Sequence, residues 1–250
     1  MAVIFLTSSP TGPLDGTRKT NGFDEMNGFR KTLKSFWKPN SKCIIACADP
    51  SDRMRNMEML DYFKSVCDLS DMSFDSFDLL DDYRRDITDE EILSYDVIIL
   101  GGGHVPTQNR FFTEIGLRRK LLGFEGIIIG ISAGSMNAAE VVYAQPELEG
   151  ESVDPDYQRF LVGLGLTELM ILPHYQQVKD NYLDGRLLFK DITLPDSIGR
   201  CFTVLPDGSY LLSVDGEETV FGEAYKIANG VLTKVCENDG CVGGVEFYGK

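Results

Sequence analysis

A serine enclosed by glycines is the residue of this sequence with the clearest potential for chemistry. Ser132 lies in the stretch GISAG (130–134), which fits the pattern G-x-S-x-G and joins an apolar run to a tract of small residues. The pattern is typical of a nucleophilic serine on a sharp turn between a strand and a helix. The backbone N–H of Ala133, at the start of that helix, could stabilise an oxyanion. Tight packing of small residues is the alternative explanation.

Two histidines are available as the base that a serine hydroxyl needs. His104 follows three glycines at the end of one apolar run, and His174 follows another apolar run. The carboxyl ends of parallel strands share one edge of a sheet, so both histidines could lie near Ser132. We expect His174 to be the base, because His104 belongs to a glycine turn suited to completing an oxyanion hole. A structural hydrogen-bonding role is the alternative for either one.

A base of this kind is usually oriented by an acid. Asp207, in LPDG after the apolar run 201–205, is the candidate because it follows a further predicted strand. Pro-Asp-Gly is also a common hairpin turn, and on spacing alone a turn is the more frequent explanation of Asp207.

The elements that must position these residues follow from the hydrophobic pattern. Apolar runs without alternation, typical of strands buried on both faces, occur at 3–7, 43–48, 97–101, 126–131 and 169–173. Helical patterns lie between them, at 23–36, at 53–67 and after the capping box of Thr88 and Glu91. In the second of these, Met54, Met57, Leu60 and Phe63 form a stripe that we expect to pack into the core.

Alternation of strand and helix predicts an α/β fold with a doubly wound, mostly parallel sheet. From about Cys201 the texture changes to short strands separated by PDG, DG and NG turns. These predict a short antiparallel C-terminal extension, added to the same sheet or packed at its edge. Without a repeat or a Pro/Ser-rich linker, the chain reads as a single domain, 1–250.

Composition excludes several classes of partner. With 24 Lys and Arg against 39 Asp and Glu, the net charge is −15, which disfavours nucleic acid and anionic membranes. The six cysteines lack the paired spacing of a zinc site, and we interpret them as reduced residues of a cytoplasmic protein. The N-terminus resembles a first strand more than a signal peptide, and no apolar run approaches the roughly 20 residues that span a bilayer.

The motifs GGGHVPTQ, GISAGS, LPHYQ and LPDG, in this order, resemble the peptidase E family of serine peptidases, which is related to cyanophycinase. The resemblance extends over most of the chain. It implies a flavodoxin-like or class I glutamine amidotransferase-like fold. It also implies cleavage of dipeptides with an N-terminal aspartate by a serine–histidine–acid triad, with no metal or organic cofactor.

The resemblance also assigns residues. Ser132 matches the nucleophile, His174 the base, and Asp207 stands where the family has glutamate. Gly102, Gly103 and Ala133 would form the oxyanion hole. The family's contacts to substrate would fall on His104, Gln108, Glu147 and Arg186, with His104 in place of the usual asparagine. Glu147 is also an alternative candidate for the triad acid.

The implied partner is a small peptide substrate, and the sequence allows a homodimer. Two other functions stay open. An α/β-hydrolase esterase shares the serine motif, but its chain order is serine, acid, histidine, whereas Asp207 follows His174 here. An inactive scaffold of the amidotransferase or DJ-1 type would keep the turn and only bind a ligand or partner.

Overall fold

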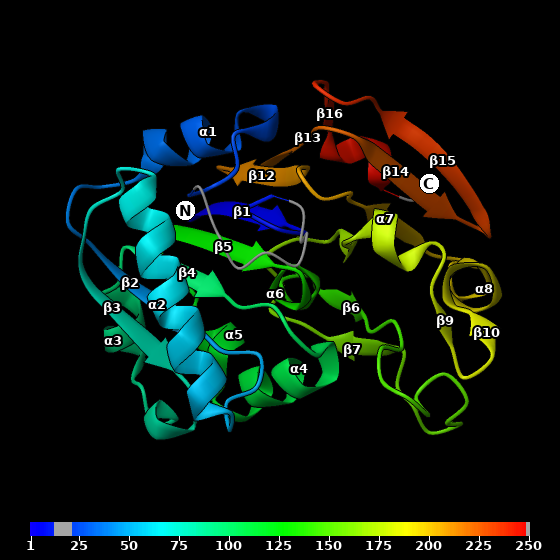
Figure 1. Cartoon of the computed structure of the whole chain (residues 1–250), viewed down its shortest axis with the longest axis horizontal. Helices are drawn as coiled ribbons and strands as arrows, with labels where there is room; N and C mark the ends of the chain where they lie inside the picture. The colour runs from blue at the N-terminus through cyan, green and yellow to red at the C-terminus, as the bar shows by residue number, and fades with distance from the viewer. Residues whose placement is uncertain (13–21, 249–250) are drawn as a thin grey trace.

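The apolar runs of the first half of the chain form the parallel part of a central sheet (Figure 1). The structure, a computed structural model, describes residues 1–12 and 22–248. The central sheet has eight strands in the order β16-β13-β12-β1-β5-β4-β2-β3. Its parallel strands are β1 (Val3–Thr7), β2 (Ser41–Ala46), β3 (Phe74–Leu80), β4 (Val97–Leu100) and β5 (Ile127–Ile131). The predicted mostly parallel α/β sheet is confirmed.

Helices cover both faces of this sheet. The described α-helices are α1 (Phe29–Phe36), α2 (Arg53–Leu69), α3 (Asp89–Leu93), α4 (Val105–Glu114), α5 (Leu117–Lys120), α6 (Ala133–Asn137), α7 (Tyr175–Val178) and α8 (Leu194–Asp196). Short 3-10 turns lie at Met26–Gly28, Asp82–Arg84 and Gly244–Phe247, and a π-helical turn at Leu188–Thr193. Side chains of α1 and α2 pack on one face of the parallel strands, and those of α3, α4 and α5 pack on the other.

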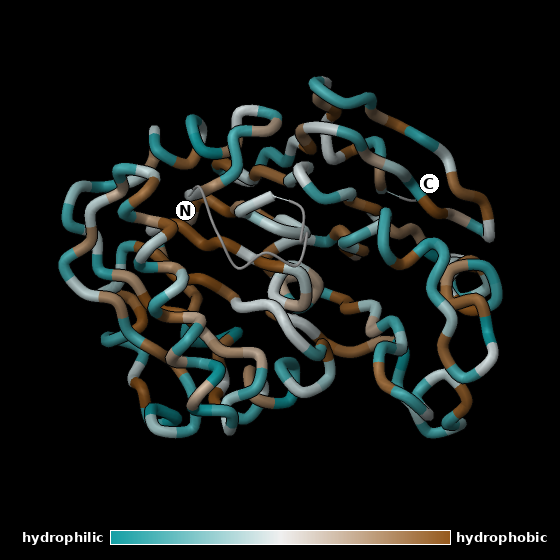
Figure 2. Tube along the Cα trace, in the orientation of Figure 1, coloured by the Kyte–Doolittle hydropathy of each residue, from teal (hydrophilic) through white to brown (hydrophobic). Residues whose placement is uncertain are grey.

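The core explains why the strands carry continuous apolar runs. Successive residues of one strand, such as Ile98 and Ile99 of β4, belong to clusters on opposite faces and are both fully buried. A strand covered on both sides needs apolar residues at every position. Figure 2 shows the resulting hydrophobic segments along the middle of the molecule.

The C-terminal strands are divided between two sheets. β12 (Tyr210–Val214), β13 (Glu217–Phe221) and β16 (Cys241–Gly243) extend the central sheet with antiparallel pairings, beginning beside β1. A second sheet has the order β15-β14-β11-β8, with β8 (Met170–Leu172), β11 (Cys201–Val204), β14 (Ala224–Ala228) and β15 (Val231–Cys236). Two small hairpins complete the strands, β6 (Val141–Tyr143) with β7 (Phe160–Val162) and β9 (Tyr182–Leu183) with β10 (Arg186–Leu187).

The placement of β8 corrects the expectation that the run 169–173 joins the other apolar runs in one parallel sheet. β8 pairs in parallel with β11 of the second sheet instead. An apolar run shows that a strand is buried but does not identify its neighbours, so the sequence pattern could not separate the two sheets.

The predicted helices are present, although the helix expected over 23–36 begins only at Phe29, and one helical face was misjudged. The capping box of Thr88 and Glu91 begins α3 as predicted. In α2, Leu60 and Phe63 are buried, whereas Met54 is 75% exposed and Met57 is 39% exposed. The expectation that both methionines pack into the core was therefore wrong. Residues three apart drift by about 60° around a helix at each step, so Met54 faces away from Phe63, while Asn56 between the two methionines is buried. Within the described residues, no helix is long and apolar enough to cross a membrane.

Candidate active site

Ser132 lies on a strained turn between β5 and α6. Its φ of 49° and ψ of −110° lie outside the regions that residues other than glycine usually adopt. Its N–H donates to the Thr7 carbonyl at the end of β1, over 3.0 Å, and its own carbonyl accepts from Met136 in α6. Strain that neighbouring bonds maintain in this way is commonly found at functional sites.

The glycines on either side of Ser132 let α6 pack close to the strands. A Cβ on Gly134 would lie 2.1 Å from the carbonyl oxygen of Leu100, at the end of β4. A Cβ on Gly130 would lie 2.9 Å from the Cα of Ser135. Both positions leave no room for a side chain, so they fix the turn at the carboxyl ends of β4 and β5.

His174 and Asp207 form a buried hydrogen-bonded pair. The Nδ1 of His174 and the Oδ1 of Asp207 are 2.7 Å apart, and the side chains are 15% and 3% exposed. A carboxylate can only accept, so Nδ1 carries the proton and Nε2 is left as the basic atom. Asp207 is thus both the turn residue and the histidine partner that the sequence offered as alternatives.

His174 also adopts an uncommon backbone conformation. Its φ of 55° and ψ of 38° place it in the left-handed region, at the residue before α7. Its carbonyl accepts hydrogen bonds from Gln177 and Val178, and its N–H donates to the Ser8 hydroxyl over 3.2 Å. The backbone of His174 is therefore held at both its N–H and its carbonyl.

The end of β1 connects the serine to the histidine. Thr7 accepts from the Ser132 N–H, and the next residue, Ser8, accepts from the His174 N–H. Ser132 and His174 are consequently brought to adjacent residues of one strand end, although they come from different sheets. Their side chains form no hydrogen bond with each other in the part of the chain that the structure describes, and such contacts often tighten only when substrate binds.

The glycine turn after β4 lies against the serine. A Cβ built on Gly102 would be 3.4 Å from the Cβ of Ser132. Gly103 approaches Ala48 so closely that a Cβ there would lie 2.6 Å from the alanine methyl group. The glycine turn is therefore packed beside the serine, where the sequence analysis expects oxyanion donors.

His104 connects that turn to an acidic loop, residues 145–152. Its Nδ1 lies 2.8 Å from the Thr107 hydroxyl, and its Nε2 lies 2.8 Å from Oε1 of Glu151. The other oxygen of Glu151 accepts the backbone N–H groups of Glu147 and Leu148. Glu151 therefore fixes the loop internally and attaches it to the residue after the glycine turn.

Glu147 belongs to the same acidic loop as Glu151. Although Glu147 is an exposed residue, desolvation of its carboxyl raises the pKa, the negative charge of Glu151 raises it further, and His104 and His174 oppose the shift. Arg55, near the start of α2, also lowers this pKa. Glu147 thus lies within electrostatic reach of the His174–Asp207 pair without touching it.

Two predicted substrate residues have their side chains engaged in other contacts. Gln108 is fully buried, and its amide donates to the Gly101 carbonyl and accepts from Asn137, so both ends are used inside the protein. Arg186 is exposed on β10 and donates to the Ser152 carbonyl over 3.3 Å. Figure 1 shows β10 at the outer end of the molecule, apart from α6.

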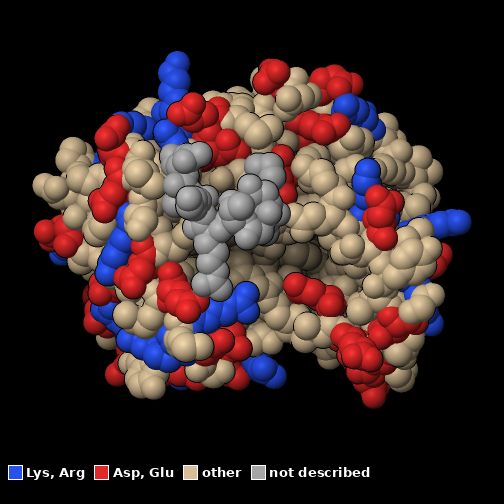
Figure 3. Space-filling view, viewed as in Figure 1, with Lys and Arg blue, Asp and Glu red and all other residues tan. Residues whose placement is uncertain are grey.

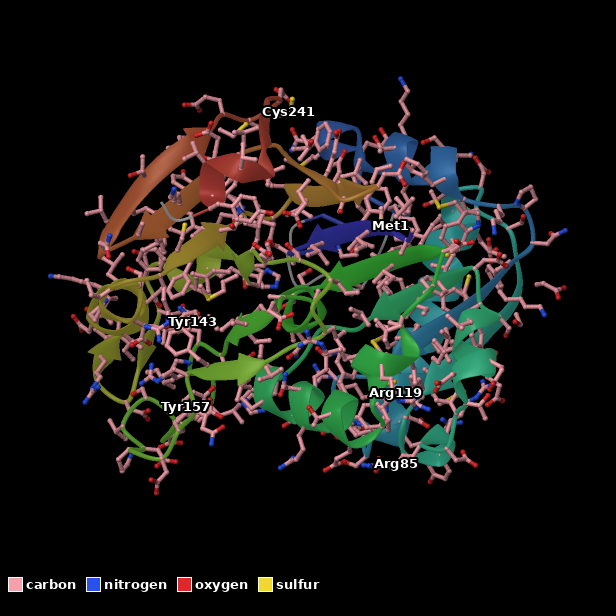
Figure 4. The ribbon with its side chains drawn as sticks, turned by 180° about the vertical axis from the view of Figure 1, so that it is seen from behind. Met1, Arg85, Arg119, Tyr143, Tyr157 and Cys241 are labelled. Carbon is pink, nitrogen blue, oxygen red and sulfur yellow. The ribbon has the colours of Figure 1, made fainter. Side chains whose placement is uncertain are left out.

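The surface of the molecule has a recess near α6 and α7. Figure 3 shows a recess in the middle of this face, between α6 and α7 in the orientation of Figure 1, with acidic side chains on its rim. Viewed from behind, Tyr143 and Tyr157 lie on the side of the β6–β7 hairpin, and Arg85 and Arg119 lie at the opposite end (Figure 4). Those two arginines pair with Glu114 and Asp89. In residues 1–12 and 22–248, no cluster of three or more His, Cys, Asp or Glu side chains is arranged to hold a metal ion.

Sequence reasoning missed several polar residues that support the pair. Gln176 bonds to the backbone N–H of Asp207, and the Gln177 amide lies 3.3 Å from its free Oδ2. Both lie in α7, two and three residues after His174, and these two polar residues so close to the histidine were the available signal. Ser8 and Glu151 gave no local signal, because their partners are distant in sequence.

The sequence matches the family described as Peptidase family S51 over residues 17–218. The chain belongs to peptidase family S51. This match confirms the resemblance to the peptidase E family. As a member of family S51, the chain is a peptidase. No curated protein matches the sequence.

Two solved structures show the same fold. A peptidase from an acI-B1 Actinobacterium superposes with a TM-score of 0.62 at 16% identity, covering 97% of each chain. A protein of Listeria monocytogenes EGD-e, provisionally designated peptidase E, has a TM-score of 0.51 at 16% identity, covering 94% of this chain and 98% of its own. At this identity the likeness extends to the fold alone.

Proposed function

We propose that this S51 chain is a serine peptidase that hydrolyses small peptides through a Ser132–His174–Asp207 triad. The observation that carries the proposal is the buried 2.7 Å contact between His174 and Asp207, attached to the same strand end as the strained Ser132. A turn of this shape, between a strand and a helix, has the geometry of a nucleophile elbow.

The chemistry would be acyl transfer. Nε2 of His174 takes the Ser132 proton as the hydroxyl attacks the scissile carbonyl. The N–H groups of Ala133 and the glycine turn hold the negative oxygen that forms. His174 then protonates the leaving amine, and water releases the acyl group from Ser132 by the same steps. Asp207 keeps the imidazole in the tautomer that this sequence requires.

The substrate class we propose is a dipeptide with an N-terminal aspartate. Glu147 lies near the histidines and suits the free α-amine, since an amine is cationic at neutral pH. A cation is needed for the aspartate side chain. Arg186 is the candidate by resemblance and Arg55 the candidate by position, because Arg55 acts electrostatically on Glu147. The free thiols of all six cysteines agree with a cytoplasmic location, which we propose as well.

The first test is release of leucine from Asp-Leu, Ala-Leu and N-acetyl-Asp-Leu by the wild type and by Ser132→Ala. We expect only Asp-Leu to be cleaved, and the variant to lose at least about 10⁴-fold in kcat, since removing the nucleophile leaves only binding and the oxyanion hole. Arg55→Gln and Arg186→Gln, assayed beside them, identify the cation by a rise in KM for Asp-Leu.

A fluorophosphonate probe separates failure of the specificity from failure of the mechanism. Labelling of Ser132 without cleavage of Asp-Leu would retain the serine hydrolase and reject the dipeptide. Neither labelling nor cleavage by the folded wild type would reject the enzyme and leave the binding scaffold.

A further inference from the structure

The nucleophile and its proposed base come from different sheets. Ser132 follows β5 of the central sheet, whereas His174 follows β8 and Asp207 follows β11, both in the second sheet. The hydrogen bond between His174 and Asp207 joins these two segments and does not reach Ser132, although Asp207 is followed three residues later by β12 of the central sheet. Contacts between the two sheets help to set the distance between the pair and Ser132.

Ser8 provides such a contact. It follows β1, which pairs with β5 in the central sheet, and it is fully buried. Its hydroxyl accepts the His174 N–H over 3.2 Å and donates to the Leu205 carbonyl over 2.8 Å. Leu205 lies two residues before Asp207, so one hydroxyl contacts the backbone of both segments that carry the pair.

The two bonds determine the direction of the hydroxyl. A carbonyl can only accept and a backbone N–H can only donate, so the Ser8 proton points to Leu205 and the oxygen lone pair faces His174. The Ser8 side chain has no exposed surface, so solvent water does not reach the two backbone groups that its hydroxyl contacts. The N–H it holds belongs to a residue in the left-handed region, where histidine needs support from its surroundings.

We infer that Ser8 is a positioning residue that sets the His174–Asp207 pair against Ser132. The inference rests on the proposed function, since positioning matters for a reaction between the two sheets. Loss of the hydroxyl would leave the His174 N–H and the Leu205 carbonyl without their partner and free the base to move away from the nucleophile. A displacement of the order of 1 Å lowers the rate of such a reaction by up to about 100-fold.

The test compares Ser8→Ala with the wild type and with Ser41→Ala. Ser41 is equally buried at the amino end of β2, and its hydroxyl also donates to a backbone carbonyl, that of Lys38. For Ser8→Ala we expect kcat and the rate of fluorophosphonate labelling to fall about 10- to 100-fold, with KM within about twofold of the wild type. For Ser41→Ala we expect both rates to be unchanged.

A second readout does not depend on activity. The chain has only two histidines, so the ring proton between His174 and Asp207 can be assigned in proton NMR spectra with the help of a His104→Gln variant. We expect this downfield signal in the wild type and in Ser41→Ala, and its loss or broadening in Ser8→Ala.

If the wild type is active, equal labelling rates for the wild type and folded Ser8→Ala, or equal losses in the two serine variants, overturn the inference. If the wild type is inactive, the ring proton decides. Loss of the ring-proton signal only in Ser8→Ala supports the role of Ser8, although the peptidase proposal fails. An unchanged signal in Ser8→Ala rejects both the role of Ser8 and the peptidase proposal.

Discussion

At the scale of single residues, the site depends on side chains that each make two contacts. Asp207 accepts from His174 at one oxygen and lies within hydrogen-bond distance of the Gln177 amide at the other. His104 contacts Thr107 and Glu151 through its two ring nitrogens. A histidine held at both nitrogens cannot act as a free base, whereas among residues 1–12 and 22–248 the ring of His174 is hydrogen-bonded at Nδ1 alone.

Replacing Asp207 by asparagine tests the orientation of His174. The asparagine amide can donate to Nδ1, which would stabilise the tautomer with the proton on Nε2, where the base must be free. We expect kcat to fall by about 10³- to 10⁴-fold with little change in KM, measured on the best dipeptide substrate. Asp207→Glu should keep part of the activity, because it keeps a carboxylate.

Asp196→Asn is the matched control for the loss of a carboxylate. Asp196 accepts from the Tyr143 hydroxyl and pairs with Arg159, away from the histidines. Similar losses of kcat in Asp207→Asn and Asp196→Asn would contradict a specific role of Asp207.

At the scale of elements, the acidic loop 145–152 is attached to its surroundings on two sides. Glu151 bonds to His104 beside the glycine turn, and Asp184 of the β9–β10 hairpin accepts the N–H groups of Gly150 and Ser152. Tyr157 contributes as well, since its hydroxyl donates to the Gln145 carbonyl over 3.5 Å. Burial and the charge of Glu151 raise the pKa of this hydroxyl, which keeps it neutral. The loop is thus held by contacts to two other elements.

Replacing Glu151 by glutamine should loosen this loop. The change removes the charge that faces His104 and weakens acceptance of the two loop N–H groups. We expect KM to rise about tenfold and kcat to change less than threefold, because Glu147 would lose its position while the His174–Asp207 pair stays intact. Glu149→Gln, an exposed glutamate in the same loop, is the control and should match the wild type. A lower kcat with unchanged KM would contradict a role in substrate binding.

At the scale of the whole molecule, the sheet arrangement determines which thiols can react. Burial raises the pKa of Cys47 and Cys67 to about 12 and that of Cys43 still higher. Since the thiolate is the reactive form, these thiols are protonated and unreactive at neutral pH. Cys241 is exposed on β16, at the edge of the molecule away from the β6–β7 hairpin (Figure 4).

Treatment of the native protein with iodoacetamide at neutral pH should therefore modify Cys241 and leave the thiols of Cys43, Cys47 and Cys67 intact. Mass spectrometry of peptides locates the label, and Cys241→Ser is the control. Peptidase activity should be unchanged, as expected of a serine nucleophile. Rapid modification of Cys47 in the folded protein would show that the central sheet opens far more readily than its burial indicates.

Sequence alone could predict the parts of this molecule that depend on local pattern. The runs at 43–48, 97–101 and 126–131 are apolar because both faces of their strands are covered, and the turn at Ser132 is marked by glycines that its packing requires. The second sheet and the contacts of Ser8 and Glu151 could not be predicted, because they depend on pairings between distant segments. Met54 was misjudged because a stripe of residues three apart turns around the helix, so its first and last members lie on different faces.

The contact between Ser8 and Leu205 also concerns how the chain is made. The two residues are separated by 197 positions, and β12, the antiparallel neighbour of β1, follows still later. Translation at about 5–20 residues per second separates their synthesis by roughly 10–40 s. During that interval the serine turn can form while its proposed base and acid have no fixed place. We therefore expect the nascent chain to lack hydrolytic activity until β12 has left the ribosome.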